Sequence, residues 1–201
     1  AREGYKARGW FKNNYVGEKY QITDVITSDV NLYAKDTEIE VPSDNRKYTF
    51  NLADPFFYAE DHEAFTPTEG SKWKFHDTAH GRSFYNDDQV DLLIGPKATI
   101  YVTLCQYGKA TNVLVLDANG ETLEALDGMS ETDGDLRTYA YEGAAGKISL
   151  KFVATGEMYI HNVKIVKTTT TNYDQAGQWI TVKAGDASSF IDAIDAANGI
   201  S

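Results

Sequence analysis

Apolar and polar residues alternate in short stretches of the chain, most regularly in its second half. In the stretch 147–152, Ile148, Leu150 and Phe152 share one face, while two lysines and a serine share the other. A period of two is typical of a half-buried antiparallel strand. Five such stretches predict five strands: Thr99–Leu104, Asn112–Leu116, Arg137–Tyr141, Lys147–Phe152 and Met158–Val166.

Turn residues separate these stretches. The pair Asn119-Gly120 tolerates positive φ and predicts a tight hairpin turn. The glycine-rich segment 142–146 supplies a second turn, which we also expect to be hairpin-like. Because no long helical periodicity lies between the strands, the pattern favours an all-β sandwich or barrel over a parallel α/β fold.

Helical periodicity occurs once, near the end of the sequence. After a strand predicted at 179–183, Phe190, Ile191, Ile194 and Ala197 fall on one helical face. The threonine-rich tract before it is typical of an extended linker. We therefore divide the chain into a short β leader, a central domain, a linker and a strand-helix tail: residues 1–40, 41–167, 168–178 and 179–201.

Composition narrows the class of partner. The 201 residues are 42% hydrophobic and 24% charged, no apolar run approaches the roughly 20 residues of a transmembrane helix, and a single cysteine excludes an intrachain disulfide. The formal net charge is −11, and residues 51–150 carry seventeen acids against seven bases. An acidic surface repels phosphate, so nucleic acid and anionic membranes are disfavoured as partners.

Candidate chemistry gathers in one polar segment, which holds Trp73, His76, Asp77, His80 and Arg82. Three interpretations stay open: hydrogen bonds that hold a loop, contact with sugar hydroxyls, and a zinc site through the two histidines. The flanking Thr, Gly and Ser residues do not indicate the helix that would place both histidines on one face.

Aromatic side chains form a second candidate set, because exposed rings stack on the apolar faces of sugars. The candidates are Trp73, Tyr85, Tyr101, Tyr107, Tyr139 and Tyr141. In the strand near residue 100, Ile100, Val102 and Leu104 form the better core face, which turns Tyr101 and Tyr107 outward. Packing inside the sandwich is the alternative for any of these tyrosines.

Acidic residues near expected loops form a third set. Asp54, Asp61, Asp87 and Asp88 offer the hard oxygen ligands of a structural Ca²⁺, although their spacing matches no EF-hand loop. A solvated acidic face is the alternative. Paired catalytic carboxylates are not identified by spacing alone, because they converge from separate strands.

The leader resembles a known extracellular module. The segments Arg2–Tyr5, Gly9–Phe11 and Val25–Lys35 are similar to the second half of the internalin-type B repeat, a β-grasp-like module of bacterial surface and secreted proteins. This resemblance implies that Trp10 and Tyr33 are core anchors. Because the first half of the repeat is missing, we expect the leader to pack on the central domain.

The rest of the chain resembles the region that precedes the catalytic β-helix in multidomain pectin methylesterases and related pectin-degrading enzymes of gut Bacteroidota. The residues that carry this resemblance are Phe75–Gly81, Gly95–Ile100, Leu104–Tyr107 and Val182–Ala187. It implies a jelly-roll-like sandwich of the carbohydrate-binding type, secreted or on the bacterial cell surface. It also implies an appended C-terminal catalytic domain, of which residues 179–201 are expected to be the start. That family's catalytic motifs, such as Gln-Asp-Thr-Leu and Leu-Gly-Arg-Pro-Trp, have no counterpart here.

From these residues and resemblances we expect a non-catalytic fragment of a larger protein. Its expected partner is pectin (homogalacturonan) or another plant cell-wall polysaccharide, with Trp73, His76, His80, Arg82, Tyr101, Tyr107 and Tyr139 as candidate contacts. We expect no catalytic residue and no cofactor other than the structural calcium considered above. The alternatives are an architectural spacer that binds no sugar and a catalytic domain of an unrecognised kind.

Overall fold

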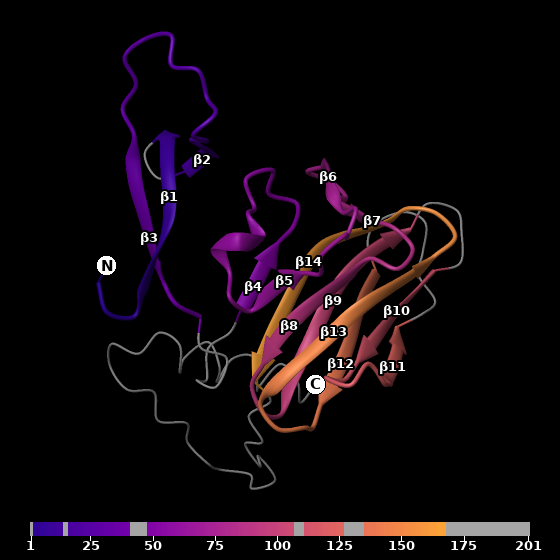
Figure 1. Ribbon diagram of the computed structural model, residues 1–201. Coiled ribbons are helices and arrows are strands. Elements are labelled where there is room, and N and C mark those ends of the chain that lie inside the picture. Colours follow the sequence, from indigo (N-terminus) through magenta and orange to yellow (C-terminus); the bar gives the residue numbers. More distant parts are fainter. Residues whose placement is uncertain (1, 14–15, 41–47, 107–110, 127–134, 168–201) are drawn as a thin grey trace, which may run out of the picture. The chain divides into compact units, whose positions relative to one another are not determined.

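The computed structural model describes residues 2–13, 16–40, 48–106, 111–126 and 135–167. Within these ranges the regular structure is β-strand apart from one 3-10 turn, η1 (Ala59–Asp61), which confirms the predicted all-β class (Figure 1). No helix in the described part of the chain is long and apolar enough to cross a bilayer. The predicted linker and the strand-helix tail, residues 168–201, lie outside the described residues.

One layer of the sandwich is an antiparallel sheet with the strand order β11-β10-β13-β8-β5. Its strands are β5 (Phe65–Pro67), β8 (Gln89–Ile94), β10 (Thr111–Leu116), β11 (Thr122–Leu126) and β13 (Gly146–Ala154). The predicted hairpin at Asn119-Gly120 joins β10 to β11. Gly120 adopts φ +87° there, and its N–H donates to the Asp117 carbonyl at 3.1 Å.

The facing layer has the order β12-β9-β14-β7-β6, and β4 also pairs with β14. Its strands are β4 (Tyr48–Asn51), β6 (Lys74–Asp77), β7 (Gly81–Phe84), β9 (Ala98–Gln106), β12 (Asp135–Tyr141) and β14 (Met158–Lys167). The first half of β14 pairs with β7 and the second half with β4. A bulge between Ile160 and Asn162 lies at this change of partner, so Ile160 and Val163 both face inward.

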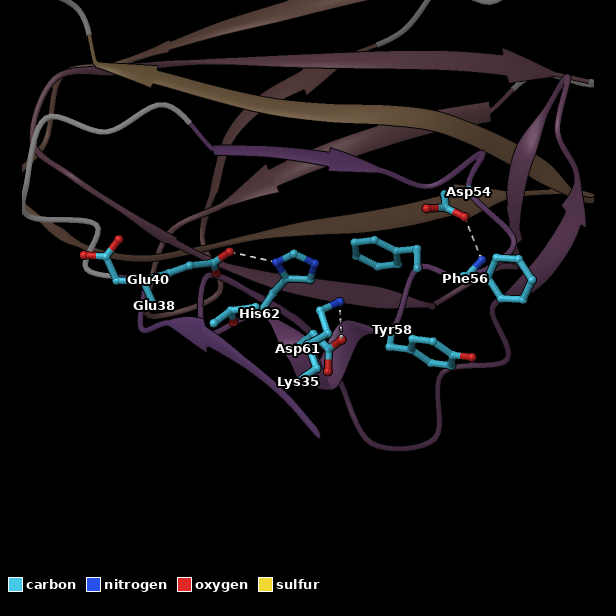
Figure 2. A pocket seen from close by; sticks show the side chains of 10 residues that line it. Lys35, Glu38, Glu40, Asp54, Phe56, Tyr58, Asp61 and His62 are labelled. Carbon is cyan, nitrogen blue, oxygen red and sulfur yellow. Dashed lines mark hydrogen bonds and ion pairs between the residues drawn. The ribbon is translucent and has the colours of Figure 1, made fainter. Parts of the chain in front are cut away.

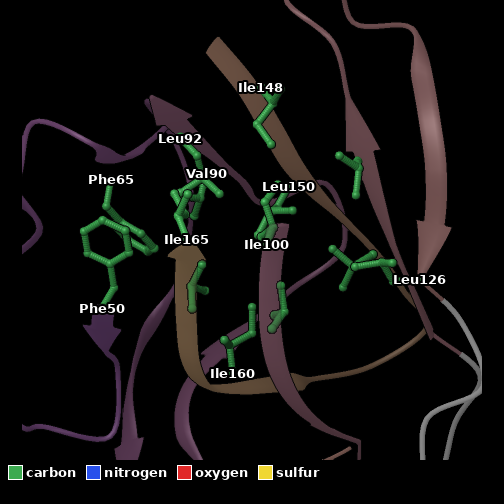
Figure 3. Close-up of a cluster of buried hydrophobic side chains, with 14 of the residues drawn as sticks. Phe50, Phe65, Val90, Leu92, Ile100, Leu126, Ile148, Leu150, Ile160 and Ile165 are labelled. Atoms are coloured by element: carbon green, nitrogen blue, oxygen red, sulfur yellow. The ribbon is translucent and has the colours of Figure 1, made fainter. Parts of the chain in front are cut away.

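A single hydrophobic core joins the two layers (Figure 3). Ile100, Val102 and Leu104 on β9 are fully buried, which confirms the predicted core face of this strand. Opposite them lie the side chains of Ile148 and Leu150 on β13. The alternation read from the sequence therefore places the correct residues inside a jelly-roll-like antiparallel sandwich.

One predicted connection is wrong. The glycine turn at 142–146 was expected to be hairpin-like, but it joins β12, which pairs with β9, to β13, which pairs with β8 and β10. The chain therefore crosses from one layer to the other. Glycine permits a sharp reversal in either case, so turn composition does not distinguish a hairpin from a crossover.

The leader forms a separate antiparallel sheet of order β2-β1-β3, made of β1 (Tyr5–Asn13), β2 (Val16–Lys19) and β3 (Tyr33–Glu38). Trp10, expected to be a core anchor, is instead 54% exposed, and Phe11 is the buried aromatic residue of β1. Pairing of β1 with β3 is interrupted by a register shift between Ala7 and Gly9.

Two buried cations attach the leader to the sandwich, as expected for a leader that does not stand alone. Arg8 donates to both carboxylate oxygens of Glu63, at 2.7 and 3.0 Å. Lys19 contacts Asp61 at 2.5 Å and Glu60 at 3.2 Å. The side chains of Arg8 and Lys19 are 1% and 7% exposed. Burying a charged side chain is costly unless an opposite charge pairs with it, and these carboxylates supply that charge.

Candidate functional site

A cavity of about 380 Å³ lies where the leader meets the first loop of the sandwich, and we call it the leader pocket (Figure 2). Strand β3 contributes Lys35, Thr37 and its last residue, Glu38, to the pocket. Alternation along the strand points Lys35 and Thr37 to the same side. The loop between β4 and β5 supplies most of the remaining lining. The full lining set is Lys35, Thr37, Glu38, Glu40, Asp54, Phe56, Phe57, Tyr58, Asp61 and His62.

An Asp-Pro turn shapes the loop side of the pocket. One Asp54 carboxylate oxygen accepts the N–H of Phe56 at 2.8 Å, and the Asp54 carbonyl accepts the N–H of Phe57 at 3.1 Å. The turn leaves Phe56 48% exposed at the pocket, whereas Phe57 packs against the core.

Arg82 holds this loop from inside the sandwich. Its guanidinium donates to the carbonyls of Leu52, Asp54 and Phe57 at 2.6, 2.9 and 2.8 Å. Burial lowers the pKa of Arg82 to about 10, which still leaves it charged at neutral pH. The rigid fork of one guanidinium therefore fixes three points of the loop.

Tyr58 connects the loop to the leader. Its hydroxyl accepts the N–H of Lys19 at 3.2 Å and donates to the Gly17 carbonyl at 3.3 Å. The Lys19 ammonium lies 4.6 Å from the centre of the Tyr58 ring, a distance that suits a cation–π contact. This wall of the pocket is therefore held by contacts within the protein.

Paired charges form the opposite side. His62 Nδ1 lies 2.7 Å from the Glu40 carboxylate, and its ring stacks on Phe57 with the ring centres 5.0 Å apart. The Glu40 backbone N–H donates to Glu63, the partner of Arg8. The hydrogen bond from Arg8 is the main reason that the pKa of Glu63 falls to about 2.

The pocket combines an exposed aromatic ring with many hydrogen-bonding groups. Four carboxylates line it, against one lysine and one histidine. Carboxylates accept hydrogen bonds from hydroxyl groups, and Phe56 offers an apolar face beside them. This arrangement is suited to a neutral, hydroxyl-rich ligand and repels an anionic one.

Trp73 and Arg82, predicted as contact residues, lie beneath the leader pocket. The Trp73 ring stacks on Phe84 with ring centres 5.7 Å apart, and the Arg82 guanidinium lies 5.4 Å from the Trp73 ring centre. Trp73 is half-buried against the core and Arg82 is 5% exposed. Both residues support the Phe57 side of the loop.

His76 and His80 lie on the β6–β7 hairpin, where the structure brings them together with Asp77. Neither residue lines the leader pocket. Their loop is held by Asp77, whose carboxylate accepts the backbone N–H groups of Ala79 and His80. The interpretation of this segment as a hydrogen-bonded loop is therefore confirmed for Asp77.

The predicted tyrosines lie elsewhere on the sandwich. Tyr101 on β9 is half-buried, with the Lys164 ammonium 5.2 Å from its ring centre. Tyr139 on β12 packs against the core, and burial raises its pKa. Tyr107 lies outside the described residues. None of the predicted contacts that the structure describes lines the leader pocket, and their roles stay predictions.

The four aspartates considered for calcium lie in two separate parts of the sandwich. Asp54 and Asp61 belong to the leader pocket, whereas Asp88 is buried and accepts the N–H groups of Lys72 and Tyr85 at 2.7 and 2.9 Å. Asp87 pairs with Lys151 at 3.2 Å. Within the described ranges, the His and acidic side chains that gather closely enough to share a metal ion are His76, Asp77 and His80.

Sequence reasoning missed most of the pocket, including Lys35, Glu38, Phe56 and Tyr58. One signal was available: three consecutive aromatic residues, 56–58, follow an Asp-Pro turn. Three neighbouring rings in a turn do not all reach one core, so at least one is expected at the surface. The contribution of β3 carries no comparable signal, because it depends on tertiary contact.

Comparisons with known proteins find similarity in structure only. No protein-family model and no curated protein matches the sequence. Among solved structures, a family 6 carbohydrate-binding module of Cellvibrio mixtus lichenase 5A in complex with cellotriose aligns at TM-score 0.40 and 16% identity, covering 60% of this chain and 97% of that one. A family 35 module from Clostridium thermocellum aligns at TM-score 0.41 and 10% identity, covering 61% and 98%.

A family 36 module from a multidomain xylanase of the Trinervitermes trinervoides hindgut metagenome aligns at TM-score 0.41 and 14% identity, covering 60% of this chain and 96% of that one. TM-scores near 0.4 establish neither a shared fold nor a shared ligand. The sandwich described above therefore rests on this chain's own strand pairing and core.

Proposed function

We propose that this protein is a non-catalytic carbohydrate-binding module whose leader pocket takes a plant cell-wall glycan. The observation that carries the proposal is the pocket itself, in which exposed Phe56 lies beside carboxylates and Lys35. Its volume of about 380 Å³ falls within the usual range of ligand sites, roughly 300–1,000 Å³. A sugar ring would stack on Phe56 while its hydroxyls bond to the acidic rim.

The charge of the pocket supports a neutral glycan. Glu38, Glu40, Asp54 and Asp61 would repel the carboxylates of de-esterified polygalacturonate, whereas methyl esterification removes that repulsion. Methyl-esterified pectin is therefore the proposed ligand within the pectic class. We further propose that the module holds such a glycan close to an appended pectin-degrading domain, which raises the effective substrate concentration.

Affinity electrophoresis against pectins of graded esterification, in calcium-free buffer of low ionic strength, tests the proposal. We expect retardation that increases with the degree of esterification. Phe56→Ala should weaken binding by about tenfold, equivalent to about 1.4 kcal/mol, without loss of stability because the ring is half-exposed.

Trp10→Ala is the matched control, because Trp10 is an equally exposed aromatic residue that does not line the pocket. Its affinity should equal that of the unmodified protein. Equal binding to esterified and fully de-esterified pectin contradicts the charge argument, and unchanged binding by Phe56→Ala contradicts the pocket assignment.

An architectural role is the second candidate, favoured by the buried ion pairs that join leader and sandwich. In that case the leader pocket is a space left where the leader packs on the sandwich, and it has no glycan ligand. A glycan array that shows no binding to any plant polysaccharide supports this alternative over the first.

A further inference from the structure

The β6–β7 hairpin brings two imidazoles and a carboxylate to one point of the surface. His76 and Asp77 end β6, and His80 immediately precedes β7. One potential ligand atom from each of the three residues lies within 4.8 Å of the other two. None of these residues lines the leader pocket, so the cluster is separate from the proposed glycan site.

The two oxygens of Asp77 both lie 2.9 Å from His80 Nδ1 but differ in their other partners. Oδ1 accepts the backbone N–H groups of Ala79 and His80 at 2.8 and 2.7 Å, which fixes the turn. Oδ2 lies 2.9 Å from His80 Nδ1 and 3.5 Å from His76 Nε2. Oδ1 therefore holds the backbone and contacts one imidazole, while Oδ2 faces both imidazoles.

Tyr159 on β14 orders the two rings from below. Its ring centre lies 4.6 Å from that of His76 and 5.6 Å from that of His80, and the side chain is buried. The Tyr159 hydroxyl donates to Glu157 at 2.9 Å, which fixes the aromatic ring in turn. Ligands held in this way lose less conformational freedom when an ion binds.

We propose that His76 Nε2, His80 Nδ1 and Asp77 Oδ2 bind a late first-row divalent ion, Zn²⁺ or Cu²⁺. In a tetrahedral site with bonds of about 2.0–2.1 Å, ligand atoms lie about 3.3 Å apart. The two distances from Asp77 Oδ2, 2.9 and 3.5 Å, bracket that value. Two imidazole nitrogens favour these ions over Ca²⁺, which prefers oxygen ligands.

The site leaves coordination positions open to solvent, since the side chains of His76 and His80 are 40% and 36% exposed. Binding weakens as the pH falls, because a protonated imidazole does not ligate a metal.

Isothermal titration of chelator-treated full-length protein with ZnCl₂, and electron paramagnetic resonance with CuCl₂, test the proposal. We expect one ion per chain and a copper spectrum with nitrogen hyperfine coupling. His76→Gln and His80→Gln should each weaken binding by more than about tenfold. His161→Gln, which changes a histidine outside the cluster, should bind as the unmodified protein does.

Asp77→Asn separates metal binding from the structural role of the turn. The asparagine keeps an oxygen to accept the two backbone N–H groups, so the thermal unfolding midpoint should change little, whereas loss of the charge should weaken metal binding. Stoichiometric Zn²⁺ or Cu²⁺ binding that survives in the His76→Gln/His80→Gln double variant overturns the proposal. The proposal is also overturned if neither Zn²⁺ nor Cu²⁺ binds, or if the protein binds Ca²⁺ more tightly than both.

Discussion

Arg82 shows how one buried side chain determines the shape of a surface loop. Its three hydrogen bonds go to backbone carbonyls of residues 52–57, the segment that presents Phe56 to the leader pocket. The sequence singled out Arg82 but did not show its role, since a basic residue among polar neighbours is as typical of a ligand contact as of a structural one. Burial distinguishes the two roles, and whether a guanidinium is buried depends on tertiary packing that the sequence does not show.

Arg82→Lys is expected to destabilise the protein by about 1–3 kcal/mol and to weaken glycan binding. A lysine ammonium lacks the planar fork that bridges three carbonyls, so at least one carbonyl would stay buried without a donor. Urea denaturation and affinity electrophoresis on the same preparation measure the two effects. Arg137→Lys, a change on β12 outside the pocket, serves as control and should alter stability by less than about 0.5 kcal/mol.

At the scale of elements, alternation identifies the regular strands in the second half of the chain and misses others, both short and long. All five strands predicted between residues 99 and 166 are present, because each has at least two inward positions that a period of two identifies. Strands β5, β6 and β7 have three or four residues and were not predicted from alternation, and neither were β1 and β8, which have nine and six residues. In β7 all four residues are buried, so no alternation exists to be read.

Gly81 begins β7 and touches β14 with its backbone. It adopts φ +88°, and a Cβ at this position would lie 2.1 Å from the Ile160 carbonyl oxygen. Gly81→Ala is therefore expected to lower the free energy of unfolding by more than about 2 kcal/mol, through both backbone strain and collision.

Gly120→Ala is the matched control for Gly81. It has nearly the same φ, +87°, but open space around the position of the added Cβ. It should cost only about 1 kcal/mol. Thermal denaturation of the two variants separates strain from collision, and equal losses would contradict the role assigned to the contact with β14.

At the scale of the whole unit 1–167, the leader pocket depends on pairings between distant residues. Arg8 and Glu63 are 55 positions apart, and nothing local to either predicts the other. The leader pocket follows from which loop of the sandwich the leader contacts, and no local pattern identifies that loop. Resemblance and periodicity therefore predicted the sandwich, whereas the leader pocket could be identified only from the tertiary contacts in the structure.

The attachment of the leader should depend on pH in the acid range. Folding lowers the pKa of Glu63 from 4.5 to about 2, mainly because Arg8 donates hydrogen bonds to it. The charged pair therefore stabilises the folded protein fully above pH 4.5 and loses this contribution as the pH falls toward 2. Solvent screening at the partly exposed carboxylate reduces the effect to roughly 2 kcal/mol.

Urea denaturation at several pH values between 7 and 2 measures this contribution. Glu63→Gln should be less stable than the unmodified protein at pH 7, because it leaves the buried Arg8 without its counter-charge. Its stability should also fall less between pH 4.5 and 2. Parallel pH profiles for the two proteins would show that the pair contributes nothing.

The position of β14 bears on how the sandwich forms. This strand pairs with β4, β7 and β9, so residues from 48 to 106 await a partner that comes at 158–167. Such pairings between distant residues give a high contact order. This slows folding, because the chain must lose the entropy of closing long loops before these contacts can stabilise it. During synthesis the strands made earlier must therefore stay unpaired on one edge until β14 leaves the ribosome, and this interval is when the chain is most prone to aggregate.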